Sequence, residues 1–522
     1  MYRLTKDIKR FSTILISIGI VAISYGFFKS LTTTSDDEIK YTIKKIAKKL
    51  DLKLKVKQSK GHNGIDYWMD ENDEVIIKTG DKIIDEDDGS KKVITEINYD
   101  GEGNYGFSMK KDKKVDYSEL IYKVEKKLNC SIDSSHIHSV EDVIYSAKHY
   151  FHAKSQRVWS SLLISTLFFL MISVAATLWW SLQYVAQAGW SALLLRVPMA
   201  ISSFLPYGAF ILIFILVTGG MHWHHTFHWM AEGINDPLDP YYDEIIANKS
   251  AYLNIPFFMS RSFIYLLGWI FFARLLKKYS LEEDVYGGAH SMKWYKKSFK
   301  TSVLFILFIG VTSSSAGWDW IMSIDTHWFS TLFSWYALAS FFVSACAFIA
   351  IITIYLMYNG YFKELNDSHM HDFGRYLLAF SIFWTYLWFA QYMLIWYSNI
   401  PEEVAYYQER YEYYYPMIMI TLLINFITPF LLLMKRSSKR SKGQLLFVAC
   451  LIVLGHYFDV FLMVTPGTMH DHWHLGFIEF GTFLGFLGLF ILIVFRNLSK
   501  YQLVQKNHPM IGESEHHEIH IH

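Results

Sequence analysis

The sequence predicts an all-α polytopic membrane protein with about ten transmembrane helices. Of its 522 residues, 52% are hydrophobic and 18% are aromatic, which is too apolar for a soluble chain of this length. Many apolar runs reach about 20 residues, the length that a helix needs to cross a hydrocarbon core of about 30 Å. Helices are expected because a helix satisfies its own backbone hydrogen bonds in lipid. A segment of soluble character follows the first run and predicts a small α+β extramembrane domain.

Ten apolar runs are predicted to span the membrane. They cover residues 11–29, 158–184, 200–219, 253–276, 299–323, 328–358, 373–399, 415–434, 444–465 and 475–496. The first follows a basic start and is either a cleaved signal peptide or an uncleaved anchor. No cleavage motif of small residues follows it, so we expect an anchor. The predicted parts of the chain are an N-terminal transmembrane anchor (1–30), an extramembrane domain (31–150), a transmembrane domain (151–500) and a disordered tail (501–522).

Basic residues in the short connections predict how the spans are oriented. Lysine and arginine concentrate in 277–300 and in 435–442, which reads KRSSKRSK. The connection 400–415, on the opposite side, is acidic and rich in tyrosine. Because lysine and arginine are enriched in cytoplasmic loops, both termini are expected in the cytoplasm and the 31–150 domain on the outer side.

The 31–150 segment mixes lysine, aspartate and glutamate densely, as soluble domains do. Ser35 to Glu38 form a capping-box pattern before an amphipathic helix, DEIKYTIKKIAKKL. Alternating residues around DEVIIKTGDKII and KKVITEINYDGEGNYGFSMKK predict strands with a Gly-rich turn, and helices are expected at 118–128 and 139–152. The segment contains no nucleophile–base set and no phosphate-binding loop, so a docking or spacer module is favoured over a catalytic one.

Cysteine and histidine patterns bear on redox cofactors and metals. Cys130, Cys346 and Cys450 form neither a CxxC pair nor a CxxCH motif, which excludes a cysteine-ligated iron–sulfur cluster and argues against covalent haem in this chain. Histidines gather in MHWHHTFHWM and MHDHWHL. On a helix, His224 and His228 would share one face and could bind a metal, but no carboxylate or cysteine lies at tight spacing beside them. We therefore predict no metal site and no redox cofactor in this chain.

Polar side chains at one depth of the predicted membrane region form the main candidate site. Such groups are costly in hydrocarbon and usually face a protein interior, a partner group or water. Counted from the span ends, six of them fall in the outer half: Arg261, Asp319, Gln391, His456, Asp459 and Glu479. The shared depth predicts one outward-opening polar pocket or proton path. The alternative is structural, with Arg261 paired to an aspartate to lock two helices.

A second, looser set of polar residues lies near the inner helix ends. It consists of Arg196, Arg274, His371, Asp372 and Arg375. Long side chains at helix ends reach water at little cost. We therefore interpret this set as topology determinants.

The stretch SSAGWDWIMSIDTHWFSTLFSW (314–335) places two aspartates and a histidine between two apolar runs. Asp325 and His327 lie in the short hinge between the fifth and sixth predicted spans. Asp325 either caps the sixth span, by accepting from its first free N–H groups, or lies with His327 at the mouth of the proton path. The tryptophans of this stretch are expected to anchor the helix ends at the membrane interface.

Long motifs give the chain a family resemblance. They are WDWIMSIDTHWFSTLFSWY (318–336), SIFWTYLWFAQYMLIWYSNIPEE (381–403), GHYFDVF (455–461), RSFIYLLGW (261–269) and NDSHMHD (366–372). Over residues 158–500 the chain resembles the larger, ActF-type NrfD-like membrane subunit of bacterial alternative complex III, a quinol:cytochrome c oxidoreductase. The 31–150 domain matches only loosely, and the outer histidine cluster is richer than the family pattern.

The resemblance implies an architecture, a location and a set of partners. Spans two to five and six to nine would form two four-helix bundles, with the first and last spans peripheral, in a bacterial inner membrane. The 31–150 domain would then be periplasmic. The implied partners are a second NrfD-like subunit, a periplasmic iron–sulfur protein, multihaem and monohaem c-type cytochromes and small membrane subunits, with a terminal oxidase as a further candidate. Haem c and iron–sulfur clusters would belong to these partners, menaquinol or another quinol would be the substrate, and nucleic acid is not expected.

In this family quinol oxidation is assigned chiefly to the sister subunit. The chain is therefore expected to scaffold the complex and conduct protons near the periplasmic side, and whether it is itself an enzyme stays open. The proton-pathway candidates are Arg261, Asp319, Asp325, His327, His456, Asp459 and Glu479. Two alternatives are a direct quinol-binding subunit and a stand-alone ion-coupled transporter. The transporter is disfavoured because transporter sites usually lie at the membrane midplane.

Overall fold

The computed structural model divides the chain into two compact units. One consists of Met1–Phe28 with Gln156–His522 and is called the helical unit; the other, Lys29–Ser155, is called the inserted unit. The sequence-based boundaries were 30/31 and 150/151. The structure describes residues 2–31, 36–50, 57–60, 66–69, 82–84, 90–99, 105–114, 117–128, 130, 132, 137, 140–231, 233–237, 242–287 and 292–518.

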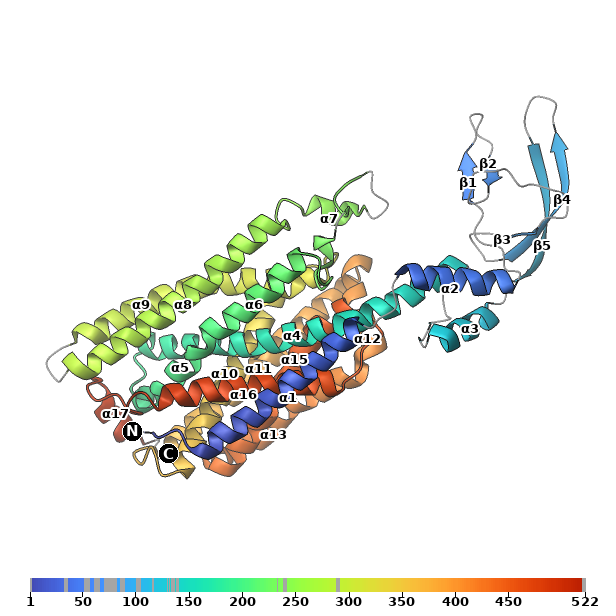
Figure 1. Cartoon of the computed structure of the whole chain (residues 1–522). Helices are drawn as coiled ribbons and strands as arrows, with labels where there is room; N and C mark the ends of the chain where they lie inside the picture. The colour runs from blue at the N-terminus through green and yellow to red at the C-terminus, as the bar shows by residue number, and fades with distance from the viewer. Residues whose placement is uncertain are drawn as a thin grey trace. The chain divides into compact units, whose positions relative to one another are not determined.

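Ten helical segments in the described chain are long and apolar enough to cross a membrane. They contain α1 (Lys6–Leu31), α4 (Val140–Val185), α5 (Arg196–Ile201) followed by α6 (Leu205–Gly220), α8 (Ile255–Tyr286), α9 (Lys293–Trp320), α10 (Thr331–Tyr358), α11 (Asp367–Ser398), α12 (Pro401–Leu422) followed by α13 (Thr428–Leu433), α15 (Lys442–Met469) and α16 (Phe477–Leu498) (Figure 1). The prediction of a polytopic helical membrane protein is confirmed.

Short elements connect these helices. They are the 3-10 turns η1 (Gly189–Leu194), η2 (Ser202–Phe204), η3 (His228–Met230) and η4 (Met322–Ile324), the π-helical turn η5 (Leu423–Ile427), and the helices α7 (Glu244–Asn248), α14 (Arg436–Arg440) and α17 (Ile511–Glu515). The end of the helical unit that carries residues 499–518 is called the tail end. The end that carries the α6–α8 and α15–α16 connections is called the far end (Figure 1).

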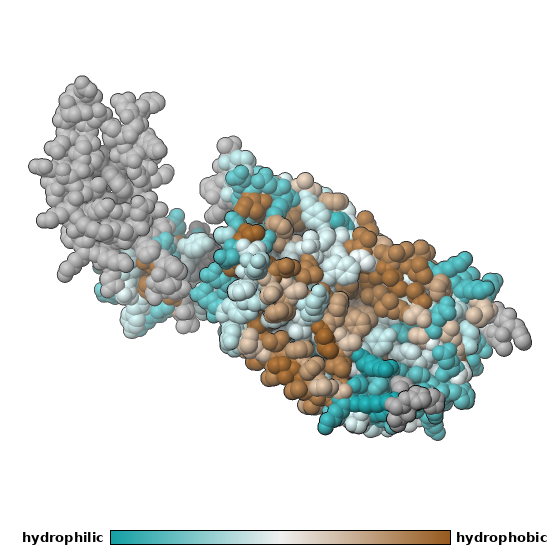
Figure 2. Space-filling model, turned by 180° about the vertical axis from the view of Figure 1, so that it is seen from behind, coloured by the Kyte–Doolittle hydropathy of each residue, from teal (hydrophilic) through white to brown (hydrophobic). Residues whose placement is uncertain are grey.

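The long helices differ in how much protein surrounds them. The apolar parts of α4 and α10 are almost completely buried, whereas those of α1 and α11 are mostly exposed. Figure 2 shows broad hydrophobic patches on the surface of the helical unit and hydrophilic residues gathered toward its ends. Exposed apolar surface of this extent is what a lipid-facing helix bundle requires, because the surrounding hydrocarbon is itself apolar.

Small residues bring the first and last long helices into backbone contact. A Cβ added to Gly19 of α1 would lie 2.3 Å from the Cα of Gly485 in α16. One added to Gly481 would lie 2.3 Å from the Cβ of Ala22. Such close approach is the usual basis of helix association in lipid, where small residues allow extensive van der Waals contact. The α1 helix is therefore held to the helical unit by shape rather than by charge.

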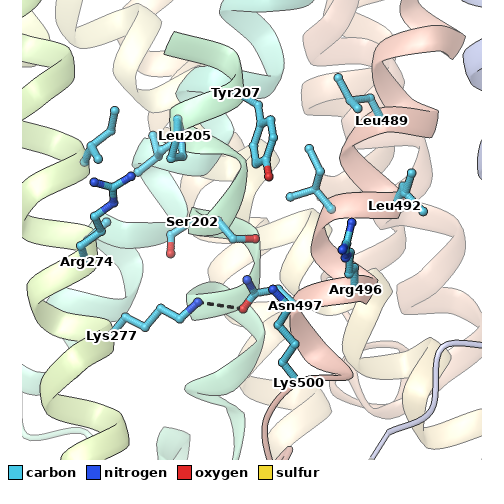
Figure 3. Close-up of a pocket in the computed structure, with 15 residues that line it drawn as sticks. Ser202, Leu205, Tyr207, Arg274, Lys277, Leu489, Leu492, Arg496, Asn497 and Lys500 are labelled. Atoms are coloured by element: carbon cyan, nitrogen blue, oxygen red, sulfur yellow. Dashed lines mark hydrogen bonds between the residues drawn. The ribbon is translucent and has the colours of Figure 1, made fainter. Parts of the chain in front are cut away.

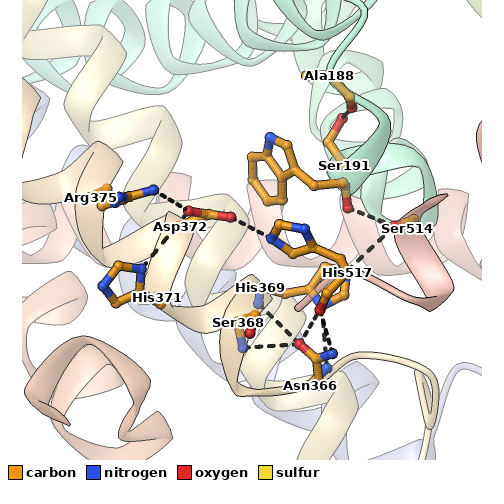
Figure 4. Close-up of polar contacts among 11 residues, drawn as sticks. Ala188, Ser191, Asn366, Ser368, His369, His371, Asp372, Arg375, Ser514 and His517 are labelled. Atoms are coloured by element: carbon orange, nitrogen blue, oxygen red, sulfur yellow. Dashed lines mark hydrogen bonds and ion pairs between the residues drawn. The ribbon is translucent and has the colours of Figure 1, made fainter. Parts of the chain in front are cut away.

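The chain after α16 folds back onto the tail end, so the prediction of a disordered tail is wrong for residues 501–518. The Ser514 hydroxyl donates to the carbonyl of Trp190 at 2.6 Å, and the Asn366 amide donates to the carbonyl of His517 at 2.8 Å (Figure 4). The His517 Nε2 lies 2.7 Å from Asp372. These partners come from η1 and α11, and the polar composition of the tail gave no sign of them.

The acidic, tyrosine-rich segment 400–415 was expected to be a connection between spans. It instead forms the first turns of α12, which begins at Pro401. Proline suits the first helical turn, and Glu402 and Glu403 interact favourably with the helix dipole there. The ring of Tyr406 stacks on Trp328 with centroids 3.8 Å apart, which ties this turn to the α9–α10 connection.

In the inserted unit, three helical segments enclose a small core. The helices α2 (Asp36–Lys49), α3 (Ser118–Leu128) and the first part of α4 bury Ile39, Leu120 and Val143 among their apolar residues. The helix predicted at 118–128 is confirmed with the same bounds. Residue Ser35 of the proposed capping box lies outside the described residues.

Strands in the inserted unit form two antiparallel sheets. They are β1 (Lys57–Lys60) with β2 (Asp66–Met69), and β3 (Lys82–Ile84) with β4 (Ser90–Tyr99) and β5 (Tyr105–Lys114), in the order β3-β4-β5. The side chains of these strands lie outside the described part of the chain. A compact α+β domain over 31–150 therefore stays a prediction.

Candidate functional site

The structure distributes the predicted outer residues over separate clusters. Among the described residues, Asp319, Asp459 and Glu479 each bind partners from a neighbouring helix, and no hydrogen bond joins one of the three to another. These three carboxylates therefore belong to separate hydrogen-bonded clusters, while Gln391 and Asp459 line one cavity. The sequence indicates how far along a helix a residue lies, but not which neighbouring helix it faces.

Arg261 and Asp319 form a doubly hydrogen-bonded ion pair between α8 and α9. The guanidinium donates from Nε to Oδ2 at 2.9 Å and from Nη2 to Oδ1 at 2.8 Å. The Tyr265 hydroxyl donates to the same carboxylate at 3.1 Å, and Arg261 also donates to the carbonyl of Tyr252 at 3.0 Å. Asp319 is completely buried. Both of its oxygens are committed, which is the geometry of the helix-locking alternative.

Glu479 forms a similar pair between α16 and α4. Arg157 donates from Nε to Oε1 and from Nη2 to Oε2, each at 2.6 Å. The backbone N–H of Gly476 donates to Oε2 at 2.8 Å, so the carboxylate also caps the start of α16. The sequence-based reading missed Arg157, which lies immediately before the second predicted span.

Asp459 has a different environment, built by three helices. The Tyr336 hydroxyl donates to its Oδ1, while Ser340 Oγ and Trp384 Nε1 donate to its Oδ2 at 2.7 and 2.8 Å. Ser340 Oγ also lies 2.8 Å from Nδ1 of His456. Asp459 and His456 are 1% and 0% exposed. Among the described residues neither a lysine nor an arginine is bonded to this carboxylate, so no permanent cation fixes its charge.

Two buried nitrogen atoms near this cluster lack partners. The Nε2 of His456 and the Nε2 of Gln391 have no hydrogen-bond partner within the described protein. Gln391, Trp384 and Asp459 line one cavity of about 40 Å³. A cavity needs only about 10–15 Å³ to hold a water molecule, and buried polar atoms without protein partners commonly bind one. The cluster therefore adjoins a space suited to water.

Arg410 lines the same cavity from α12 and pairs with Asp325. Its Nη2 donates to Asp325 Oδ2 at 2.8 Å, and its Nε and Nη1 donate to the carbonyls of Leu462 and Tyr406. Asp325 was a candidate cap for the helix now seen as α10, but the residue at that position is Ser330, so the capping interpretation is wrong. Arg410 was missed because its segment was read as a loop, although a lone arginine among tyrosines was a usable signal.

Glu409, the residue before Arg410, forms a more exposed pair with His470 at the far end. Glu409 and His470 are 2.8 Å apart, and the Tyr414 hydroxyl donates to the carbonyl of His470 at 2.5 Å. The hydrogen bond with Glu409 raises the pKa of His470 above its ordinary value. Side-chain exposure falls from 53% at His470 to 17% at Asp325 and 2% at Asp459. Titratable groups thus extend from the far-end surface to the buried cluster.

His327 and His224 serve local structure at the far end. His327 lies 2.6 Å from Asp243, whose carboxylate also accepts from Ile245 and Ile246 at the start of α7. Burial raises the pKa of Asp243, but the Ile246 N–H, the His327 ring and the Ile245 N–H outweigh it, so the pKa lies below the ordinary value. His327 therefore holds α7 and has no described bond to the Asp459 cluster.

The helix assumed for a His224–His228 metal site is absent from residues 221–227. Both ring nitrogens of His224 lie within hydrogen-bond distance of protein groups, at 3.0 Å from the Ile215 carbonyl and 2.8 Å from the Thr226 hydroxyl. Burial lowers the pKa of His224 to about 4. A neutral histidine with both nitrogens occupied has no lone pair free for a metal.

Comparisons with known proteins identify no family: no family model matches the chain, and no curated protein matches its sequence. The fold and site together define a polytopic helical membrane protein with a buried aspartate–histidine cluster. The resemblance to NrfD-like subunits rests on the sequence motifs alone.

Proposed function

We propose that this chain is an integral membrane subunit of a respiratory quinol:cytochrome c oxidoreductase of the alternative complex III type. It scaffolds the assembly and conducts protons near the outer side of a bacterial inner membrane, with both termini cytoplasmic and 31–150 forming a periplasmic docking domain. Helices α4, α6, α8 and α9 would form one four-helix bundle and α10, α11, α12 and α15 the other. The redox centres, haem c and iron–sulfur clusters, belong to partner subunits. The sequence motifs support the family and the Asp459 cluster supports the mechanism.

One observation carries the proton-conducting role: Asp459 is buried beside a water-sized cavity, and its hydrogen-bond donors among the described residues are all neutral. Protonation of Asp319 would leave the buried guanidinium of Arg261 without a counterion, whereas protonation of Asp459 leaves no bonded cation of the described protein unpaired. The Ser340 hydroxyl contacts both Asp459 and His456, so it can accept a proton from one and donate its own to the other. Water in the cavity would connect Asp459 to the Arg410–Asp325 pair and the far end.

This mechanism narrows the set of pathway residues. Asp459, His456 and Asp325 remain, and Ser340 and Arg410 join them. Arg261–Asp319 and Glu479–Arg157 act as helix-locking pairs, and His327 supports α7.

The test is quinol oxidation by the intact complex carrying Asp459→Asn. Removing a group that transfers protons is expected to slow quinol-dependent cytochrome c reduction and proton release by about 100-fold, the usual contribution of an acid–base group. The matched control is Glu402→Gln, an exposed carboxylate at the far end, which should keep turnover within about twofold of the wild type on the same scale. Full turnover and full proton release by an assembled Asp459→Asn complex would reject the relay.

The assembly itself is tested separately by purifying the tagged full-length chain in mild detergent. Haem staining and mass spectrometry of the co-purified proteins should reveal c-type cytochromes and an iron–sulfur protein. A homogeneous chain without haem would reject membership of the complex and favour the transporter alternative.

Direct quinol binding at the Asp459 cluster is disfavoured by size. The cavity there is about 40 Å³, whereas ligand pockets usually measure about 300–1,000 Å³. Photoaffinity labelling with a quinone analogue would distinguish the two roles, since labelled peptides from α10, α11 or α15 would indicate a quinol site in this subunit.

A further inference from the structure

A cavity of about 480 Å³ opens between α6, α8 and α16 on the side of the tail end. Four basic side chains line it: Arg274 and Lys277 of α8, Arg496 of α16, and Lys500 just after that helix. In Figure 3 the α8 pair faces the α16 pair across the opening, with Ser202 between them. This cavity is called the basic pocket.

Little of this positive charge is balanced by the protein. Lys277 donates to the amide oxygen of Asn497 at 3.2 Å, which is a neutral partner. Arg274, Arg496 and Lys500 form no ion pair within the described part of the chain, and no carboxylate occurs among the described residues that line the pocket.

Three acidic residues follow further along α8, and none of them lines the pocket. Glu283 is buried, and neither of its carboxylate oxygens has a hydrogen-bond partner within the described protein. Asp284 pairs with Arg196, and Glu282 lies 3.9 Å from Lys278. Four like charges around one cavity repel one another, most strongly where water is partly displaced by apolar groups. A bound anion would remove this repulsion, so the charge pattern indicates an anionic ligand.

The other wall of the pocket is apolar. Leu205 of α6, Ile270 of α8, and Leu489 and Leu492 of α16 extend from the basic side chains toward the middle of the helices. A small inorganic anion would leave this surface unused. A ligand with a charged head and hydrocarbon chains would cover both parts, and basic pockets between transmembrane helices are known to bind anionic lipid head groups.

We propose that the basic pocket binds the phosphate head group of an anionic phospholipid, whose acyl chains lie along α6 and α16. Arg274 and Lys277 would contact the phosphate from one side and Arg496 and Lys500 from the other, with the Ser202 and Ser203 hydroxyls as further donors. The lipid would then join α6, α8 and α16 at their tail ends. This proposal does not depend on the respiratory role, since it needs only the membrane location and the pocket.

The test compares lipid binding by the full-length chain after delipidation in detergent. Cardiolipin, phosphatidylcholine and inorganic phosphate are added separately, and bound lipid is counted by native mass spectrometry while thermal unfolding is followed. Arg274→Gln/Arg496→Gln removes two pocket charges. Lys296→Gln/Lys300→Gln is the matched control, because it removes two exposed charges from the start of α9 at the same end.

Cardiolipin should bind and stabilise the wild type, and phosphatidylcholine should do so much less. Each basic residue near an anionic lipid contributes about a factor of five in affinity, so the pocket variant should bind cardiolipin about 25-fold more weakly and the control variant nearly as well as the wild type. Equal stabilisation by inorganic phosphate would show that the pocket binds a free anion and would reject the lipid proposal. Equal binding by both double variants, or by phosphatidylcholine, would reject the site.

If the pocket variant fails to fold, the wild type still decides the question. Binding through four basic side chains must weaken steeply as ionic strength rises, because salt screens partly exposed charges. Cardiolipin binding that is insensitive to salt would overturn the proposal.

Discussion

Asp319 and Asp459 are both buried aspartates of the helical unit, at one predicted depth, but their partners differ in charge. Asp319 binds the guanidinium of Arg261 through both oxygens. Asp459 binds two hydroxyls and an indole, beside a histidine. The first carboxylate is paired with a permanent cation, whereas the second accepts hydrogen bonds from neutral donors. Burial alone therefore does not distinguish these two carboxylates; the charge of their partners does.

The largest expected effect in this comparison is on stability, at Asp319. Asp319→Ala leaves the guanidinium of Arg261, which is only 8% exposed, without a counterion. Loss of one partner from a buried ion pair typically lowers the free energy of unfolding by about 3–5 kcal/mol. Thermal unfolding of the purified chain measures this. The double variant Arg261→Met/Asp319→Leu should recover most of the loss, and a single variant as stable as the wild type would contradict the helix-locking role.

Gly467→Ala should lower stability by less than Asp319→Ala, by disturbing the ion pair between Asp325 and Arg410. An added Cβ would lie 2.5 Å from Oδ1 of Asp325, so the carboxylate must shift from the position in which it accepts from Arg410. Overpacking of this kind costs about 1–3 kcal/mol. Gly443→Ala in the same helix α15 is the control, because nothing lies within 4 Å of its added Cβ. Thermal unfolding should separate the two variants, and equal stability would mean that Asp325 has room to shift.

Asp459→Asn should cost less stability than Asp319→Ala, in keeping with its neutral partners. The amide retains one oxygen acceptor, and the Tyr336 hydroxyl can turn to accept from the new NH₂ group. The expected loss is about 1–2 kcal/mol, the usual cost of an altered buried hydrogen bond. Thermal unfolding again measures it. A loss as large as that of Asp319→Ala would indicate that Asp459 is also a locking residue.

The smallest expected effect is the pH dependence of stability that comes from the exposed Glu409–His470 pair. The Glu409 hydrogen bond raises the pKa of His470, so this pair stabilises the fold below the ordinary histidine pKa of about 6.5. That contribution is lost as the pH rises through the raised pKa of the folded state. Since His470 is about half exposed, the contribution is below about 1 kcal/mol. Unfolding of wild type and Glu409→Gln should differ at acidic pH and converge at alkaline pH, and a constant difference would contradict this origin.

The sequence predicted the features that depend on one helix at a time. Apolar run lengths located ten spans, and counting from their ends placed Asp319 and Asp459 correctly inside the protein. Features that depend on packing between helices were left open or missed: an Arg261–aspartate pair was only one alternative, and Arg157 and Arg410 were not found. Nothing in the residues around Asp319 distinguishes a pairing with Arg261 from one with another buried cation, and Arg410 entered the site only because segment 400–415 is helical.

The glycine contact between α1 and α16 has a consequence for how the chain is made. Ribosomes synthesise α1 first and α16 last among the long helices, so the surface that receives Gly19 does not exist until nearly the whole chain has been inserted. Until then α1 can pack only against earlier segments such as α4, where Phe27 contacts Trp159 with ring centroids 5.0 Å apart. Docking of α1 on α16 then brings Tyr2 against Phe495, with ring centroids 5.7 Å apart, and completes assembly of the helical unit.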